Sequence, residues 1–541
     1  MSHPAAPTSP PPAPEAPSKR VLVSGATGYI GGRLVPCLLA AGHDVRCFVR
    51  SSERLDGQPW LEDVEVAQGN ALRAQTIPPA MEDIDAAYYL IHSLGAGKGQ
   101  FADRDRRAAT NFGRAAKEQG VGRLLYLGGI EPKGDRRSEH LESRLETGRC
   151  LRESSGPGVD VTEFRAAVVI GSGSLSFELI RNLTERLPVM ICPRWTDTPT
   201  QPIAVRDVLS YLTAALRVPE SRDEIIEVGG ADVTTYADMF KTYAAVRGLR
   251  RLVINVPLLT PTLSSHWVGL VTPVTNKVAR PLIEGLDNEV TVTDGGKARD
   301  LFPEIEPIKM EAAMRLALRR YADRTVPTLW HSALSSSPQG REVVEELERT
   351  EGMIKEKRRR RVNASPEAVF RMAQTLGGET GWLYANFLWV LRGYLDLLAG
   401  GIGYRKGRRH PTKLRKGDVV DFWRVEVVDG RMDPKTLRLR AEMKTGGRAW
   451  LQYEISAPED APPGAEQAFI TQTAFFEPKG LFGLLYWYAL YVPHRFIFTG
   501  MIEELGRRAE LFQRHAARQN GSADAPLPDL TPELLAKLVE R

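Results

Sequence analysis

The sequence has little cysteine, and its few cysteines are not spaced as metal ligands. Only four occur among 541 residues, and no two of them form a Cys-x-x-Cys pair: Cys37, Cys47, Cys150 and Cys192. Disulfide frameworks and zinc sites both need cysteines at characteristic spacings. We therefore expect reduced thiols, a cytoplasmic location and no metal site.

Long apolar runs are also scarce. One run, "LFGLLYWYALYVPHRFIF" (481–498), raises the question of a membrane helix, but Pro493, His494 and Arg495 interrupt it. An arginine inside a spanning helix costs ~2.5–3.5 kcal/mol on insertion scales. We predict a buried helix here, with contact at a membrane surface as the alternative.

Charge of one sign does not dominate the chain either. A net charge of +5 with 26% charged residues is too weakly basic to indicate a nucleic-acid partner. The N-terminus lacks the basic and then apolar pattern of a secretory signal, and residues 1–18, with seven prolines, predict a disordered tail. We expect a cytoplasmic protein of two or more domains, whose oligomeric state the sequence leaves open.

The sequence changes in character near residue 330. From 19 to 330, short β-branched runs alternate with helical patterns, which predicts an α/β domain with a doubly wound parallel sheet. Residues 331–354 are polar and suit a linker, and residues 355–516 suit helices followed by antiparallel strands. Residues 517–541 predict a C-terminal tail with a helix that Thr531 caps and Pro532 begins.

The strands of the second domain alternate apolar and charged residues. In "LRLRAEM" the apolar residues share one face: Leu437, Leu439, Ala441 and Met443. The charged residues share the other face: Arg438, Arg440 and Glu442. This period of two predicts a sheet with one solvent-exposed side. The following "KTGGR" supplies Gly446 and Gly447 for a hairpin turn.

The segment "VLVSGATGYIGG" (21–32) predicts a dinucleotide site. A strand leads into Gly25, Gly28 and Gly31, and an amphipathic helix follows. The first glycine permits a tight turn, the second lets the backbone approach a pyrophosphate, and the third allows close packing of helix and strand. The alternative is a purely structural turn, but a strand before and a helix after the glycines favour cofactor binding.

The end of the second strand indicates which dinucleotide binds. Where an NAD site keeps an acid for the ribose hydroxyls, this chain has Arg50 and Ser51, with Arg54 close behind. Positive charge at this position suits the 2′-phosphate of NADP. NADP is therefore the favoured cofactor and NAD the alternative; the arginines would otherwise be solvated surface charges.

At these residues the chain resembles the atypical short-chain dehydrogenases/reductases, near their NmrA-like and epimerase-like branches. "SGATGYIGG", with Thr27, Tyr29 and Ile30, is similar to that family's nucleotide loop. "YYLIHSLG" (88–95), with His92 and Ser93, is similar to the strand and loop beside the nicotinamide ribose, and "QPIAVRDV" (201–208) to the segment before the substrate-covering region. The resemblance covers residues 19–330 and implies an adenine contact for Asn70.

The chain departs from this family at its catalytic positions. The serine position reads Gly128-Gly129, and the tyrosine and lysine positions read His140 and Arg144. The pKa of histidine suits proton transfer near neutral pH, and arginine can still bond ribose hydroxyls. Three interpretations stay open: a catalytic His140, a site that only binds cofactor, or another residue acting as the acid.

A helix farther along offers a candidate substrate contact. "SFELIRNLTERLP" (176–188) places Phe177 and Arg181 on one face, as an apolar wall with an anionic clamp. The alternative is core packing for the phenylalanine and a surface position for the arginine.

The second domain resembles the START-like and polyketide-cyclase-like helix-grip proteins. The resemblance rests on "RRRRVNASPEAVF" and on the order of helix, antiparallel sheet and long terminal helix. It implies an apolar cavity, which buried aromatics would line unless they simply form the core: Trp382, Trp389, Trp423, Trp450, Phe475 and Trp487.

Two basic segments complete the candidate surfaces. "YRKGRRHPTKLRK" (404–416) has eight basic residues, counting His410, and "KEKRRRR" (355–361) precedes it. No aromatics are interleaved in the loop, which argues against stacking on bases. The loop is either solvated or in peripheral contact with an anionic membrane or a phosphate.

Two hypotheses of function follow. The first is an NADP-dependent oxidoreductase acting on an apolar carbonyl or enone, with a small lipophilic substrate held or presented by the second domain. The second is a non-catalytic NAD(P)-binding sensor or scaffold, which the substitutions at the catalytic positions favour.

Overall fold

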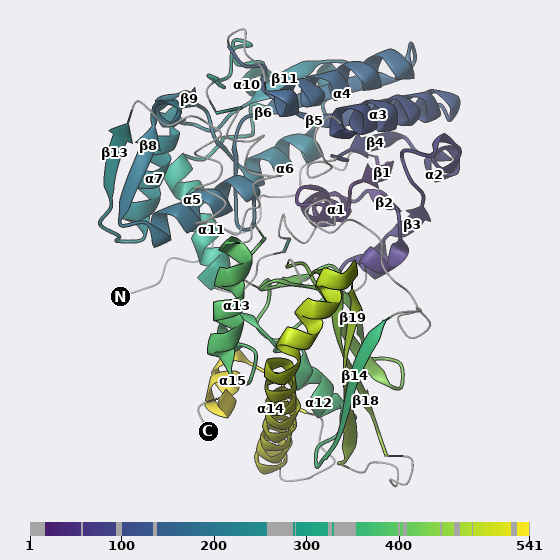
Figure 1. Cartoon of the computed structure of the whole chain (residues 1–541). Coiled ribbons are helices and arrows are strands. Elements are labelled where there is room, and N and C mark those ends of the chain that lie inside the picture. Colours follow the sequence, from purple (N-terminus) through teal and green to yellow (C-terminus); the bar gives the residue numbers. More distant parts are fainter. Residues whose placement is uncertain are drawn as a thin grey trace.

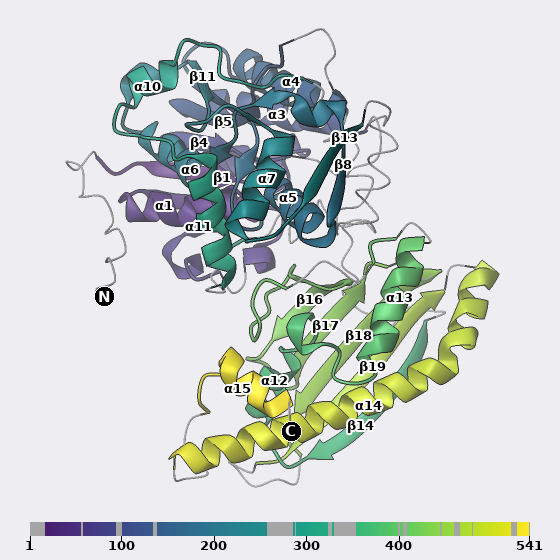
Figure 2. The same ribbon diagram turned by 90° about the vertical axis from the view of Figure 1, so that its left-hand side faces the viewer.

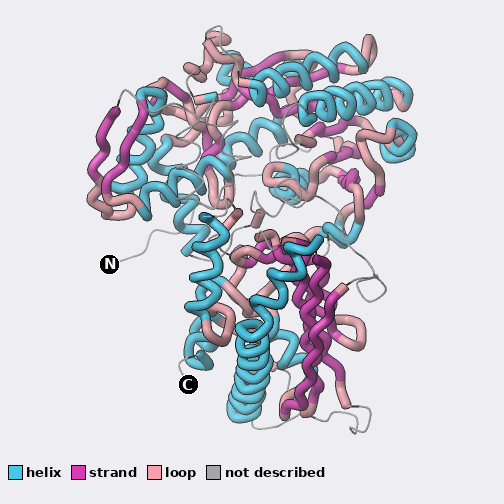
Figure 3. Tube along the Cα trace, viewed as in Figure 1, coloured by secondary structure: helices cyan, strands magenta, loops and turns pink. Residues whose placement is uncertain are grey.

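The computed structural model describes most of the chain. The described residues are 17–55, 58–92, 100–133, 138–256, 285–286, 288–322, 327–328, 353–398, 401–403, 408–443, 446–458, 466–478, 480–520 and 527–539. Most of the expected tail (1–18) and linker (331–354) lies outside these residues. Two bodies of different architecture result, one built on a parallel sheet and one on an antiparallel sheet (Figures 1 and 3).

The first body contains the predicted doubly wound parallel sheet. Seven strands lie in the order β11 (Ile225–Val228), β6 (Asp160–Ala166), β5 (Arg123–Gly129), β4 (Ala86–Tyr89), β1 (Arg20–Ser24), β2 (Asp44–Val49) and β3 (Glu65–Gln68). Every pairing among them is parallel. The chain order reverses between β1 and β4, and open α/β sheets bind ligands in the crevice at such a point.

Helices bury both faces of this sheet. On one face lie α2 (Pro78–Met81), α3 (Gln100–Glu118) and α4 (Glu139–Ser155). On the other lie α1 (Gly31–Ala40), α6 (Val205–Ala214) and α10 (Lys297–Leu301). The strands are mostly apolar on both sides for this reason, as is typical of parallel strands.

A lobe beside the sheet completes the first body (Figure 1). Its helices are α5 (Leu175–Arg186), α7 (Tyr236–Val246) and α11 (Met310–Ala322). Its short strands pair as β7 (Val169–Ile170) with β10 (Ile203–Ala204), β8 (Val189–Pro193) with β13 (Leu252–Val256), and β9 (Pro199–Thr200) with β12 (Thr234–Thr235).

The second body is an antiparallel sheet with helices on one face. Its strands lie in the order β14 (Ile354–Val362), β19 (Ala468–Pro478), β18 (Gly447–Ser456), β17 (Lys435–Ala441), β16 (Trp423–Asp429) and β15 (Val419–Val420). Against them pack α12 (Pro366–Ala373), α13 (Asn386–Leu398), α14 (Gly480–Asn520) and α15 (Pro532–Val539). Figure 2 shows α14 lying along the sheet for the length of the domain.

The hairpin and the last helix form as their residues predict. Gly446 precedes β18 with φ +66°, a conformation that glycine adopts without strain. The Leu534 amide donates to the Thr531 hydroxyl at 3.3 Å, which caps α15. This helix buries Leu535 and Leu538 in the core of the second domain, so the C-terminal segment expected as a tail is part of that domain.

The expectation of one solvent-exposed sheet face is wrong over β16 and β17, although it holds on β14, where Lys355, Lys357 and Arg359 of the same face are exposed. Arg440 and Glu442, which lie on the charged face of β17 and just after it, are 3% and 2% exposed. Arg424 pairs with Glu442 at 2.7 Å, and Arg440 pairs with Glu426 at 3.2 Å. Because each arginine meets a glutamate on the neighbouring segment, the charged face is neutralised within itself and does not need solvent.

The other face of this sheet is an aromatic core. Trp382 packs on Trp389, Phe422 and Trp423 with ring centroids 5.3 to 5.9 Å apart. Trp487 stacks on Phe476 on this face, whereas Trp450 and Phe475 pack together on the charged face, where Trp450 lies opposite Arg440. All six aromatics singled out in the sequence are buried, so they form packed clusters of the domain core.

Candidate functional site: the carboxyl edge of the parallel sheet

The glycine loop between β1 and α1 has the geometry that a dinucleotide requires. Gly25 has φ +81°, and a Cβ there would lie 2.6 Å from the Leu90 carbonyl oxygen. A Cβ on Gly31 would collide with the Gly25 carbonyl, so the helix approaches the strand closely. A Cβ on Gly28 would meet only the Gly25 carbonyl oxygen, at 3.0 Å, and otherwise faces space that a pyrophosphate can occupy.

The loop is held from behind by residues that no motif indicated. The Thr328 hydroxyl donates to the Tyr29 carbonyl at 3.0 Å, and the Arg33 guanidinium donates to that hydroxyl at 2.8 Å. Arg33 also donates to the Ser172 carbonyl at 2.6 Å and stacks over the Tyr29 ring. One indication of these contacts is present in the sequence, which is an arginine in the otherwise apolar first turn of α1. A charged side chain that is buried needs hydrogen-bond partners.

The other loop residues divide into packing and binding roles. The Tyr29 ring lies under the Arg33 guanidinium and its hydroxyl is buried, and this burial raises the pKa of Tyr29 to about 12. Ile30 packs against the core at the start of α1. Thr27 lies in the turn between Gly25 and Tyr29, and its side chain is partly buried.

The residues expected at the adenosine end follow β2 and β3. Arg50 is exposed and comes directly after β2, and Ser51 and Arg54 are partly buried in the turn that follows. Asn70 follows β3, where its side-chain oxygen accepts from the Leu72 amide at 3.1 Å. These residues therefore lie at the edge of the sheet where β1 ends, as a ribose and adenine contact requires.

A buried polar cluster lies at the end of β4. The His92 imidazole Nδ1 lies 3.0 Å from the Asp105 carboxylate on α3, and the Ser143 hydroxyl of α4 lies 3.5 Å from the same carboxylate. Burial lowers the pKa of His92, and the hydrogen bond to Asp105 opposes that shift. Asp105 thus fixes the orientation of the imidazole. Ser93, expected beside it, lies outside the described residues.

The opening of α4 holds the two residues at the family's tyrosine and lysine positions. Ser138 caps the helix, and its hydroxyl accepts from the Leu141 amide at 3.2 Å. The Arg144 guanidinium donates to the Leu127 carbonyl of β5 and lies over the Tyr126 ring at 5.2 Å. The helix places His140 one turn before Arg144, but the side chain of His140 lies outside the described part of the structure.

The candidate substrate residues on α5 are engaged in packing. Phe177 is fully buried between Tyr243 and Tyr321, with ring centroids at 5.9 and 6.5 Å. Arg181 pairs with Glu178 at 3.0 Å and lies over the Tyr321 ring. Both side chains join α5 to its neighbours, and a contact of either with substrate stays a prediction.

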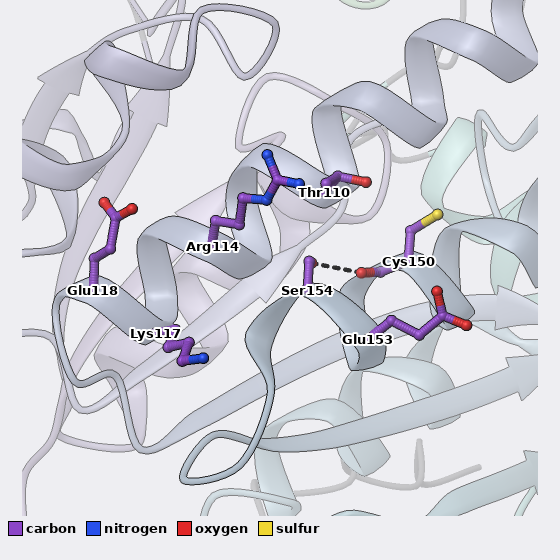
Figure 4. Close-up of a pocket in the computed structure, with 7 residues that line it drawn as sticks. All are labelled: Thr110, Arg114, Lys117, Glu118, Cys150, Glu153 and Ser154. Carbon is purple, nitrogen blue, oxygen red and sulfur yellow. Dashed lines mark hydrogen bonds between the residues drawn. The ribbon is translucent and has the colours of Figure 1, made fainter.

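A surface hollow of about 560 Å³ lies elsewhere, between α3 and α4 (Figure 4). The residues around it are Thr110, Arg114, Lys117, Glu118, Cys150, Glu153 and Ser154. They belong to the C-terminal halves of the two helices, which lead back to the amino ends of the strands. This hollow is therefore at the opposite edge of the sheet from the glycine loop.

Comparison with protein families supports the geometry of the first body. Residues 25–152 match a family model described as NAD(P)H-binding. Residues 353–501 match a family described as a protein of unknown function, DUF2867. The first match contains the glycine loop, Arg50, His92 and the start of α4.

Several curated proteins are similar to the N-terminal region. The 3 beta-hydroxysteroid dehydrogenase/Delta 5→4-isomerase of Mycobacterium tuberculosis is 34% identical over 116 residues, 20% of this chain and 30% of that protein. Sterol demethylase protein B of Methylococcus capsulatus is 27% identical over 169 residues, 28% of this chain and 51% of that protein. The chain thus spans between about a third and a half of these relatives.

A third relative matches over a longer stretch. The 4-hydroxy-2-methyl-3-oxo-4-farnesyl-3,4-dihydroquinoline-1-oxide ketoreductase of Stigmatella aurantiaca is 23% identical over 320 residues, 52% of this chain and 91% of that protein. Among solved structures, the triphenylmethane reductase of Citrobacter sp. complexed with NADP(H) is 15% identical with a TM-score of 0.44, covering 55% of this chain and 99% of that one.

The sheet order, the glycine loop and the family match agree with one another. The order in which the chain forms the strands of the parallel sheet reverses between β1 and β4. The loop after β1 leaves room for a pyrophosphate, and residues 25–152 match the NAD(P)H-binding model. The N-terminal body of this protein is an NAD(P)-binding Rossmann domain.

Proposed function

We propose that the protein is an NADP-dependent oxidoreductase that acts on an apolar carbonyl or enone. The observation that carries the proposal is the open face of Gly28 at the switch point of the sheet, with Arg50 following the neighbouring strand. A nicotinamide cofactor bound there supplies the hydride. The amides at the start of α1 bind the pyrophosphate, and Arg50, Ser51 and Arg54 bind the 2′-phosphate.

The relatives support an apolar substrate. Their names refer to a hydroxysteroid, a sterol and a farnesyl-bearing quinoline, and two of them are named a dehydrogenase and a ketoreductase. These compounds share a large hydrocarbon body. A carbonyl or enone on such a body is the substrate class we propose, with the second domain presenting it as START-like proteins hold lipophilic ligands.

Proton transfer to the carbonyl oxygen needs a donor at the carboxyl edge of the sheet. His140 lies in the first turn of α4, and His92 lies at the end of β4 with its Nδ1 held by Asp105. Arg144 is engaged with the Leu127 carbonyl, which suits it to hold the end of β5 rather than to transfer a proton. We propose His140 as the donor and His92 as the residue that replaces it if His140 is dispensable.

The test is reduction of lipophilic ketones and enones by NADPH, followed by loss of NADPH absorbance and by mass of the product. His140→Ala should lower turnover by ~10²–10⁴, the usual contribution of general acid catalysis, with little change in NADPH affinity. His92→Ala is the paired variant, and a loss confined to it assigns the proton to His92. Turnover unchanged in both variants would rule out both histidines as the donor.

A non-catalytic NAD(P)-binding sensor is the second candidate. It is favoured by Gly128 and Gly129 at the family's serine position and by the contact of Arg144 with Leu127. Tight NADPH binding without turnover of any ketone or enone, together with a partner affinity that depends on the nicotinamide redox state, would establish it.

A further inference from the structure

Two neighbouring helices of the second domain present an apolar surface to the outside. On α13 the exposed large residues are Phe387, Leu391, Tyr394, Leu395 and Leu398, and on the first half of α14 they are Leu485, Tyr488, Tyr491, Val492 and Phe496. The helices are in contact, because Trp389 packs on Phe498 and Arg392 lies over the Tyr486 ring at 5.2 Å. We call these ten residues the α13/α14 surface.

The helical spacing explains why this surface stays outside. Leu485, Val492 and Phe496 recur at intervals of seven and four, so they share one side of α14. Trp487, Phe498 and Met501 lie on the opposite side and are buried against the domain core. The run that raised the question of a membrane helix is therefore two-sided, with one apolar side packed and the other exposed.

The size of the surface indicates an interaction site. Aromatic side chains each carry roughly 150–250 Å² of surface, so ten large residues about half exposed exceed the apolar patch of an ordinary monomer. Val492 and Leu398 are 74% and 80% exposed. Within the described part of the chain no helix is long and apolar enough to cross a bilayer, so the surface can lie on a membrane but not span it.

The charge around the surface distinguishes between partners. Residues 480–502 contain one basic residue, Arg495, and no acidic residue. On α13 the basic residue is Arg392, and the one acid, Asp396, is buried and accepts from the Gly403 amide at 2.9 Å. A symmetric pairing of α14 with its copy in a second chain would bring Arg495 near the other Arg495, and residues 480–502 contain no carboxylate to neutralise them.

We propose that the α13/α14 surface docks the protein on the face of an anionic lipid bilayer. The apolar side chains enter the boundary between headgroups and acyl chains, the tyrosines lie at the headgroup level, and the exposed Arg495 meets lipid phosphates. Docking does not depend on the proposed catalysis, because it uses residues of the second domain alone. It also brings a lipophilic substrate within reach of the chain.

The α13/α14 surface is distinct from the basic loop, whose contact with a membrane stays a prediction. The Arg408 guanidinium donates to the carbonyls of Gln374 and Leu376, and Arg409 pairs with Asp418 at 3.1 Å. Arg415 donates to the Gln58 side chain of the first domain at 3.1 Å. Three of the loop's arginines thus bind the protein itself, and residues 404–407 lie outside the described structure.

The apolar half of the proposal is tested by flotation of the full-length protein with vesicles of phosphatidylcholine and phosphatidylglycerol. Leu485→Gln combined with Val492→Gln changes two outward side chains of α14 and leaves the core intact. This variant should bind about tenfold or more weakly than wild type. The matched control, Ile191→Gln combined with Ile254→Gln, changes two residues that are 54% and 41% exposed in the first domain and should bind as wild type does.

The charge half is tested by comparing these vesicles with pure phosphatidylcholine. Wild type should prefer the anionic vesicles and lose that preference at high salt, and Arg495→Gln should reduce the preference about fivefold. Arg514→Gln, on the far half of α14 and equally exposed to solvent, should leave it unchanged. Wild type that does not float, equal loss in the control variants, or a dimer in solution that Leu485→Gln and Val492→Gln dissociate would overturn the proposal.

Discussion

The two sheets of this protein bury their faces by different means. The parallel sheet is mainly apolar, with one ion pair between Glu163 and Arg165 on β6, and helices cover both of its faces. The antiparallel sheet has helices on its aromatic side, while its other side buries Arg424, Glu442, Glu426 and Arg440 as ion pairs. The two sheets thus differ in how their second face is buried: helices cover it in the first sheet, and ion pairs between neighbouring strands neutralise it in the second.

This difference shows that the alternation of apolar and charged residues predicts which side chains share a face of the sheet. It does not predict whether that face is exposed to solvent. Arg424 and Arg440 lie directly opposite each other on β16 and β17. Their glutamates lie diagonally, and Trp450 also donates to Glu426 at 3.0 Å. Charged residues that are neutralised across strands can be covered, so a period of two marks which residues share a side and nothing more.

The largest expected effect is the loss of dinucleotide binding by the first domain while that domain stays folded. Gly28→Val should abolish dinucleotide binding, since a branched side chain would fill the space that the loop leaves for the pyrophosphate. Calorimetry should give a dissociation constant above ~1 mM, less than about 4 kcal/mol of binding free energy. Gly122→Val is the control, because a Cβ there lies 3.5 Å from its nearest neighbour, in ordinary contact. Wild-type affinity in a folded Gly28→Val protein would make the loop structural only.

The next largest expected effect is a loss of stability in the second domain, with the cofactor site of the first domain unchanged. Glu442→Ala removes the carboxylate from a buried arginine and should lower the free energy of unfolding by about 3–5 kcal/mol. Glu477→Ala, which removes a partly exposed pair with Arg448 on the same sheet, should cost about 0–1 kcal/mol. Denaturant titration measures both. Equal small losses would show that the buried pair is not tightly coupled to folding.

A third prediction concerns the pH dependence of the free energy of unfolding of the second domain. Burial raises the pKa of Asp421 to about 6, although the Gly378 amide and the Trp382 indole donate to it. The folded state therefore holds a proton that the unfolded state has lost between about pH 4 and pH 6, and stability falls as pH rises through this window.

The measurement is the difference in unfolding free energy between wild type and Asp421→Asn at each pH. Asp421→Asn should gain about 2–3 kcal/mol over wild type between the bottom and the top of the window, at 1.36 kcal/mol for each pKa unit. Asp63→Asn, an exposed residue of the first domain, should follow wild type throughout. A constant difference across the window would contradict the shifted pKa.

The smallest expected effect concerns cofactor choice. Wild type should bind NADP(H) more tightly than NAD(H), and Arg50→Glu should weaken NADP(H) binding about 10- to 100-fold, the value of one or two charge-assisted hydrogen bonds. Arg114→Glu, an exposed residue at the opposite edge of the sheet, controls for net charge. Equal affinities for both dinucleotides in wild type would remove the basis for NADP.

The sequence predicts those parts of the site that depend on neighbouring residues along the chain. The glycine loop, and in the second domain the cap on α15 by Thr531, each involve residues within a few positions of one another. Two contacts at the site join residues far apart in sequence: the hydrogen bond from Thr328 to the Tyr29 carbonyl of the loop, and the pairing of His92 with Asp105. No local pattern encodes such contacts, because the packing of α3 and the return of the chain after α11 create them.

What the sequence determined by itself is the order of elements and the nature of each sheet. β-branched runs alternating with helices require a parallel sheet with helices on both faces, and alternating apolar and charged residues require an antiparallel one. Tertiary structure decided which charges are buried and which apolar residues are exposed. Glu442 is covered because Arg424 lies beside it, and Val492 is exposed because the opposite side of α14 packs on the core, and both outcomes depend on neighbours that only the folded chain brings together.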